Sequence, residues 1–200
     1  MKSIQIQIVF LLLVGLLSVA NAGFGPCPVA PIEHNDFNAT DMRGLWYLYS
    51  TSNGYYDAYR NECRTDLIMS KSDDITDLDF KVFTSSFDKN TNRTQRFSKQ
   101  MIFDDVSNPT CSIKVEGGYL PTTMTVMKTD HFSYAVVSVC KNIGLYHFNH
   151  FEVLTRDKLP SKYHRNLIAT TTRKFGYHHK TDFRRVPTIE CYKPDPQRRD

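Results

Sequence analysis

The chain consists mainly of short runs in which apolar and polar residues alternate, separated by turn residues. In one of them Leu78, Phe80 and Val82 alternate with polar neighbours. A period of two is typical of strands that bury one face, and many such runs at even spacing are typical of an all-β sandwich or barrel. We expect strands at 45–51, 64–70, 77–85, 94–103, 111–115, 122–128, 132–140 and 144–155.

The segment after these runs has helical spacing instead. Leu159-Pro160-Ser161 is a typical helix entry, and Gly176 is a typical stop. Between them, apolar or small residues recur at helical spacing, at Tyr163, Leu167, Ile168, Thr171 and Phe175. The pattern therefore predicts one amphipathic helix over about 161–175. The order of strands, helix and extended tail argues against an immunoglobulin-like sandwich.

The start of the chain predicts the compartment. Lys2 precedes an apolar run from Ile8 to Val19, which ends at the cleavage signal Ala20-Asn21-Ala22. We expect a signal peptide over 1–22 and a secreted, extracellular domain over 23–200. An uncleaved anchor is the alternative, but the run is short for a membrane span, and no later stretch approaches that length.

Composition and charge narrow the function. The 13 Phe and 11 Tyr suit strands or an aromatic-lined pocket. The net charge of +4 is small and the basic residues are scattered, so no nucleic-acid partner is expected. The sequence has no Ser-His-Asp, paired-carboxylate or metal-ligand motif, so we expect neither an enzyme nor a metal or other cofactor.

Five cysteines in a secreted chain imply disulfides and one odd thiol. They are Cys27, Cys63, Cys111, Cys140 and Cys191. No pair has the C-x-x-C spacing of a redox or zinc site. The residues alone leave the pairing open.

Three short motifs give the chain a family resemblance. They are Gly44-Leu45-Trp46, Thr129-Asp130-His131-Phe132-Ser133-Tyr134, and the arginine of Leu154-Thr155-Arg156. Together they resemble the G-x-W, the T-D-x-x-x-Y and the last-strand arginine of the lipocalin family. His131 stands where tyrosine is common. The resemblance covers nearly all of 26–191.

The resemblance implies a fold and roles for these residues. The fold is an eight-stranded antiparallel up-and-down β-barrel over about 44–156, with one C-terminal α-helix packed outside. Gly44, Trp46, Thr129, Asp130, Tyr134 and Arg156 would be structural. Trp46 would plug the closed end, with the guanidinium of Arg156 over its indole. The alternative is an ordinary core tryptophan and a surface arginine.

The resemblance also implies a disulfide pairing. Gly25-Pro26-Cys27-Pro28 is similar to the start of apolipoprotein D and its relatives, the invertebrate bilin- and carotenoid-binding lipocalins. In that branch the pairing corresponds to Cys27–Cys140 and Cys63–Cys191, with the second bridge tying back the C-terminal tail. Cys111 would be unpaired, unless it bridges two copies in a homodimer.

The ligand of a lipocalin lies in the barrel, which is lined by alternate residues of each strand. If Arg156 points inward, alternation places the preceding even-numbered positions of its strand inside as well. Glu152 is our choice for the polar contact, because a buried carboxylate needs a partner that a ligand could supply. The expected ligand-binding residues are Leu67, Met69, Met124, Val126, Phe148, His150, Glu152 and Leu154. Plain core packing or a register error is the alternative for each.

The predicted function is therefore a secreted carrier of a small hydrophobic ligand such as a lipid, retinoid, sterol or bilin pigment. The alternatives are a lipocalin-type lipid isomerase that uses an exposed cysteine, or a scavenger of a signalling amine or eicosanoid. Acid in the lining would favour an amine. In lipocalins the loop after the first strand folds over the open mouth, so Tyr55, Tyr56 and Tyr59 would gate entry or contact the ligand; a loop packed on its own side chains is the alternative. Asn38 and Asn92 open glycosylation tripeptides.

Overall fold

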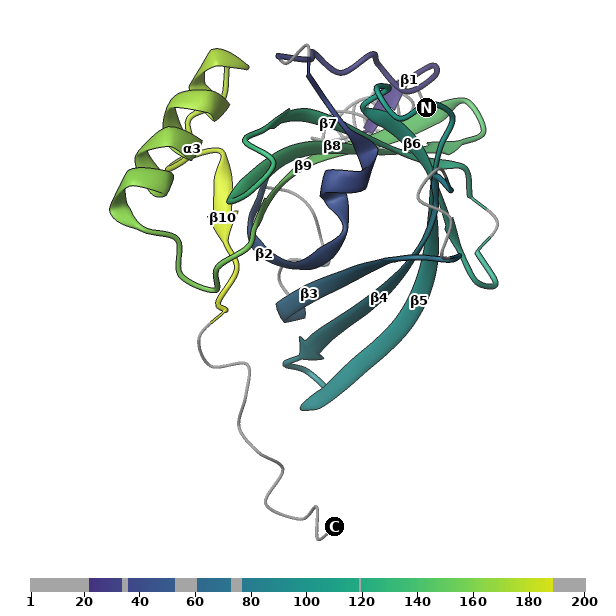
Figure 1. The fold of residues 1–200 in the computed structure, drawn as a ribbon, viewed down its shortest axis with the longest axis horizontal. Helices are drawn as coiled ribbons and strands as arrows, with labels where there is room; N and C mark the ends of the chain where they lie inside the picture. The colour runs from purple at the N-terminus through teal and green to yellow at the C-terminus, as the bar shows by residue number, and fades with distance from the viewer. Residues whose placement is uncertain (1–21, 34–35, 53–60, 73–76, 119, 189–200) are drawn as a thin grey trace, which may run out of the picture.

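The described part of the chain forms one antiparallel sheet that closes on itself (Figure 1). This computed structural model describes residues 22–33, 36–52, 61–72, 77–118 and 120–188. Eight strands follow one another around the barrel: β2 (Gly44–Ser52), β3 (Asn61–Ser70), β4 (Asp79–Asp88), β5 (Arg93–Phe103), β6 (Thr110–Val115), β7 (Thr122–Thr129), β8 (Tyr134–Ile143) and β9 (Tyr146–Thr155). Closure comes from pairing of β9 with β2, where Tyr47 lies opposite Thr155.

The predicted all-β barrel with an outer helix is confirmed. Each expected strand overlaps one of β2–β9. Three short elements were not expected: β1 (Ala22–Phe24), β10 (Phe183–Arg185) and the 3-10 helix η1 (Ala39–Met42). Each has three or four residues, too few to show a period in the sequence. β1 extends the sheet beside β9, and β10 pairs with β2.

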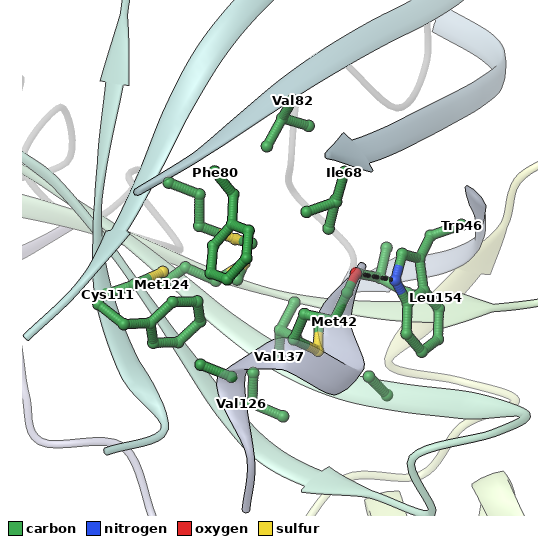
Figure 2. Packing of buried hydrophobic residues seen from close by; sticks show 14 of the residues in the cluster. Met42, Trp46, Ile68, Phe80, Val82, Cys111, Met124, Val126, Val137 and Leu154 are labelled. Carbon is green, nitrogen blue, oxygen red and sulfur yellow. Dashed lines mark hydrogen bonds between the residues drawn. The ribbon is translucent and has the colours of Figure 1, made fainter. Parts of the chain in front are cut away.

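The barrel interior holds the larger of two apolar clusters, gathered towards the end where β2 begins and β9 ends (Figure 2). Met42 of η1 reaches into this end together with Trp46 of β2, and Phe80 of β4 lies further along the same cluster, on the side of Met124. Residues before the first barrel strand thus close one end of the barrel. We call it the closed end.

The second apolar cluster lies between the outer face of the sheet and α3 (Lys162–Lys174), which Figure 1 shows beside the barrel. Ser161 caps the helix by accepting a hydrogen bond from the His164 amide. Ile168 is fully buried against Val153 and other outward residues of the sheet. Gly176 follows with a φ of 85°, a conformation that favours glycine and ends the helix.

The cysteines follow the predicted arrangement as far as the described residues reach. Cys27 and Cys140 form a disulfide, which ties the segment before η1 to β8. Cys111 is free and buried. Cys63 is disulfide-bonded, and its amide donates to the carbonyl of Pro187 at 3.0 Å. Cys191 lies outside the described residues, so the Cys63–Cys191 bridge stays a prediction, as does the signal peptide, of which only Ala22 is described.

Candidate functional site

The closed end is built around the single tryptophan. The indole of Trp46 is fully buried, and its Nε1 donates to the carbonyl of Met42 at 2.7 Å (Figure 2). The guanidinium carbon of Arg156 lies 3.7 Å from the centroid of the indole ring, close enough for a cation–π contact. The predicted contact of Arg156 with Trp46 is confirmed, although Arg156 directly follows the last barrel strand, β9, rather than lying on it.

The same guanidinium fastens two backbone segments. Arg156 donates to the carbonyls of Leu45, at 3.1 Å, and Asp41, at 2.7 Å. Gly44 lies directly beside it with a φ of 95°, and a Cβ there would come within 3.0 Å of the Arg156 Nη1 atom. The positive φ therefore favours glycine, and a side chain at this position would also push the Arg156 guanidinium away from its contacts.

The turn between β7 and β8 completes this end of the molecule. One carboxylate oxygen of Asp130 accepts hydrogen bonds from three backbone amides of the turn, those of Phe132, Ser133 and Tyr134. These bonds lower the Asp130 pKa although partial burial alone would raise it. His131, the departure from the family pattern, has its Nδ1 atom 2.7 Å from the Asp41 carboxylate. The departure therefore adds a contact to η1.

A cavity of about 360 Å³ occupies the barrel interior between this closed end and the opposite mouth. Its volume lies in the range typical of small-molecule sites. Its deeper wall is apolar and includes Met42, Ile68, Met101 and Leu154, all buried. Nearer the mouth it is lined by half-exposed Phe97 and Val115.

Charged side chains cross the middle of the cavity. Arg64 of β3 forms a bidentate pair with Glu152 of β9, at 2.6 and 3.2 Å. The guanidinium also reaches Asp66, at 2.8 Å. His150 lies 3.2 Å from the same Glu152 carboxylate. The strands that carry these groups lie on either side of β2, and barrel closure brings them together.

Asp66 joins this cluster to a lysine on the facing wall. Its carboxylate accepts from the Thr84 hydroxyl at 2.5 Å, and both its oxygens lie 3.4 Å from the Lys99 ammonium. We call Arg64, Asp66, Lys99, His150 and Glu152 the cavity cluster. The negative charges of its two carboxylates equal the positive charges of the guanidinium and the ammonium. These groups can be buried because each charge lies beside one of opposite sign.

The electrostatics of the cavity cluster follow from burial and pairing. Burial alone would raise the pKa of Asp66, but the charges of Arg64 and Lys99 and the hydrogen bonds to the carboxylate lower it to about 2. Burial likewise opposes ionisation of Glu152, but Arg64 and His150 hold its pKa well below the usual range. Burial lowers the pKa of Lys99, and Asp66 only partly offsets this effect.

Comparison with known proteins identifies the fold. No family model and no curated protein sequence matches the chain. Solved structures do match: a biogenic amine-binding protein (17% identity, 84% of this chain and 92% of that one, TM-score 0.66) and insecticyanin from the tobacco hornworm Manduca sexta (15%, 83% and 88%, 0.65). Apocrustacyanin C2 is similar as well (17%, 86% and 94%, 0.64). The chain has the lipocalin fold.

Half of the expected ligand-binding residues line the cavity of this lipocalin barrel: Met124, His150, Glu152 and Leu154. Val126 is fully buried in the interior cluster but does not reach the cavity. Phe148 shares the strand face of His150, nearer the mouth, but it is 40% exposed and does not line the cavity either. A ligand role for these residues stays a prediction.

The expected orientation of β3 is wrong. Leu67 and Met69 point outward and are 38% and 48% exposed, whereas Arg64 and Asp66 line the cavity. Met69 instead borders a more open groove of about 630 Å³ on the outer face, beside Lys81 and Lys114. The apolar residues of this strand were expected inside, but this wall of the cavity is charged.

Four further residues line the cavity although none of them was expected there: Arg64, Asp66, Thr84 and Lys99. Each is a polar residue within an alternating run, where polar residues were assigned to solvent. Arg64 and Asp66 share one strand face with the apolar Ile68, whereas Leu67 and Met69 share the other, so hydrophobicity did not decide which face of this strand lies inside. Glu152 is accordingly not an isolated polar contact, because Arg64 and His150 already engage it.

Several other predictions can be placed. Asn38 and Asn92 are exposed, the first as the cap of η1 and the second in the β4–β5 turn. Tyr55, Tyr56 and Tyr59 lie outside the described residues. In the described part of the chain no helix is long and apolar enough to cross a membrane, and no group of His, Cys, Asp and Glu is arranged to hold a metal ion.

Proposed function

We propose that the protein carries a small, largely apolar molecule with one polar group inside its barrel. The observation that carries this proposal is the cavity itself, about 360 Å³, with a buried apolar wall at the closed end and charged groups in the middle. Binding energy would come mainly from apolar surface removed from water, and the charged groups would orient the ligand.

Similar structures support a binding role. By name, one of them is a biogenic amine-binding protein, and another is a siderocalin described with dual ligand specificities (16% identity, TM-score 0.53). At such identities the ligand does not transfer from one protein to another. The ligand must therefore be inferred from the lining of this cavity.

A thiol-dependent isomerase is the competing function. It needs an accessible thiolate, because the thiolate is the reactive form of cysteine. Cys111, the free cysteine among the described residues, is 3% exposed, and burial raises its pKa far above the usual range. Its position therefore favours a carrier over this enzyme. Its burial also disfavours a disulfide to a second copy.

Secretion belongs to the same proposal. The leader-like start of the chain supports it, as does the Cys27–Cys140 disulfide, because such bonds persist in oxidising compartments. Expression of the full chain in a eukaryotic cell should release a protein that begins at Gly23. Retention of the first 22 residues in the purified protein would contradict this part. A mass increase at Asn38 or Asn92 that N-glycosidase removes would establish glycosylation.

The binding proposal is tested by extraction and by titration. Small molecules extracted from the natively purified protein are identified by mass spectrometry, and the stripped protein is titrated calorimetrically with fatty acids, retinoids, sterols, biliverdin and amines. We expect at least one dissociation constant below about 10 μM, which corresponds to roughly −7 kcal/mol. No binding by any compound, and none extracted, would contradict the carrier function.

Adjacent residues of β6 offer a matched pair of variants that locates the ligand. Val115 lines the cavity near its mouth and also borders the outer groove, whereas Lys114 borders the groove alone. Val115→Trp should weaken binding by filling the cavity, and Lys114→Trp should leave it unchanged. The reverse result would place the ligand on the outer face of the barrel.

A further inference from the structure

We propose that Lys99 selects the ligand, and that the ligand's polar group is a carboxylate rather than an amine. This inference rests on the proposed function and names the class of ligand that the cavity takes: an apolar molecule ending in an acid. Three observations support it: Asp66 and Glu152 already accept hydrogen bonds from protein donors, the contact of the Lys99 ammonium with Asp66 is long, and Lys99 lies on an apolar stretch of the cavity wall.

An amine has little to gain from the acidic residues of the cavity. Both carboxylate oxygens of Glu152 already accept from Arg64, and one of them also lies 3.2 Å from His150. Asp66 accepts from Arg64, Thr84 and Lys99. A cationic ligand would have to displace these donors or lie beside a guanidinium and an ammonium, which repel it. The charge pattern therefore disfavours an amine despite the acidic lining.

Lys99 is the donor with unused capacity. An ammonium can donate three hydrogen bonds, but among the described residues this one has Asp66 as its single partner, with both oxygens at 3.4 Å. That separation is long for a charge-assisted hydrogen bond, which is typically nearer 2.8 Å. The Lys99 side chain is only 14% exposed and lines the cavity, so further acceptors must come from a molecule held in the cavity. A ligand carboxylate would supply them.

The position of Lys99 suits a molecule with an apolar tail. Its neighbours across the strands are Val82 and Val115, so its ammonium rises from an apolar stretch of wall. Met101, two residues further along β5, lies on the same face and nearer the closed end. An acid bound at Lys99 would thus direct its tail towards the closed end. Burial lowers the pKa of Lys99, and an anion beside it would oppose that effect.

Three ligands that share one alkyl chain test the inference on the unmodified protein. Decanoic acid, decanol and decylamine differ only at the polar end, and each is titrated calorimetrically below its aggregation concentration. We expect the acid to bind about tenfold more tightly than the alcohol, and the amine most weakly. Equal binding of acid and alcohol, or tighter binding of the amine, would overturn the inference while leaving the carrier function intact. Failure of all three, with no binding in the wider panel, would overturn the carrier function itself.

Variants assign the preference to Lys99. Lys99→Met removes the charge and leaves Asp66 paired with Arg64 and Thr84, so the ratio of alcohol to acid dissociation constants should fall from about ten to about one. Lys99→Arg keeps the charge and should keep the preference. Lys114→Met removes an exposed lysine from the neighbouring strand and should change nothing. An unchanged ratio in Lys99→Met would overturn the role of Lys99. If that variant does not fold, Lys99→Gln replaces it.

Discussion

The closed end and the cavity cluster both hold charged groups that are partly or fully buried, but they differ in how those groups are satisfied. At the closed end, Arg156 lies against the indole of Trp46 and donates to two backbone carbonyls. In the cavity cluster, the one partner of Lys99 among the described residues is Asp66, at 3.4 Å, and the lysine lines the cavity. The first arrangement is complete within the protein, whereas the second has room for a further acceptor.

This difference separates stability from binding. A closed set of contacts stabilises the fold and leaves nothing for a ligand to contribute. An incomplete set inside a cavity gives a ligand both space and a vacant hydrogen-bonding position. Four substitutions or conditions test the distinction, beginning with the largest expected effect.

Trp46→Ala should lower the free energy of unfolding by roughly 3–5 kcal/mol, as expected when a large core aromatic is removed. The indole is fully buried, and its loss leaves Arg156 without the ring beneath it. Chemical denaturation followed by circular dichroism measures the change. Phe132→Ala is the control, because that ring is 83% exposed in the same region and should cost little. Equal midpoints for Trp46→Ala and the parent would mean that the closed end contributes no stability.

Glu152→Gln should destabilise the protein by about 2–3 kcal/mol, because it removes one member of a buried pair but leaves Arg64 in contact with Asp66. From the sequence alone, Glu152 would be expected to affect ligand choice more than stability. The pairing reverses that expectation. Thermal and urea unfolding measure the loss, and the double variant Arg64→Met/Glu152→Met should recover part of it, because no unmatched guanidinium then remains. A single variant as stable as the parent would show that the pair is solvated rather than buried.

Acid should weaken the cavity cluster. Asp66 has a folded pKa of about 2 against an ordinary 3.8, so it holds its proton less tightly when folded than when unfolded. The resulting stability, about 2 kcal/mol, is fully present above about pH 4 and is lost as the pH falls towards 2. Urea unfolding at a series of pH values measures the slope. Asp66→Asn removes this titration, so a slope in that variant as steep as in the parent would assign the effect to other carboxylates.

The barrel could be predicted from the sequence because its signals are local. Alternation within each strand, the cap at Ser161 and the lipocalin motifs each occupy a few neighbouring residues. Trp46 and Arg156 also belong to such local motifs. Once the first and last barrel strands are known to pair, the two residues are expected to lie next to each other. The arrangement of Trp46 and Arg156 at the closed end could therefore be predicted from the sequence.

Most of the cavity cluster could not be predicted, because its members come from β3, β5 and β9 and carry no shared motif; only His150 and Glu152, both on β9, were expected to face inward. The orientation of β3 was the decisive error. A register shift between Glu62 and Thr65, next to Cys63 with a φ of 60°, precedes the residues that face inward. Alternation fixes which residues share a face, but hydrophobicity decides which face is inside only where the interior is apolar. Here Asp66 lies inside and Leu67 outside.

The smallest effect is expected for Arg156→Ala, which tests whether the closed end depends on its cation as well as on its indole. The guanidinium is partly solvated, so its cation–π contact and its two hydrogen bonds should together contribute about 1–2 kcal/mol. Arg156→Lys keeps the charge but loses the planar group that reaches both carbonyls, and should fall between the parent and the alanine variant. Denaturation of the three proteins in parallel gives the order. Ligand affinity, measured on the same samples, should be unchanged, because Arg156 does not line the cavity. A loss of affinity without a loss of stability would mean that the closed end, rather than the cavity cluster, contacts the ligand.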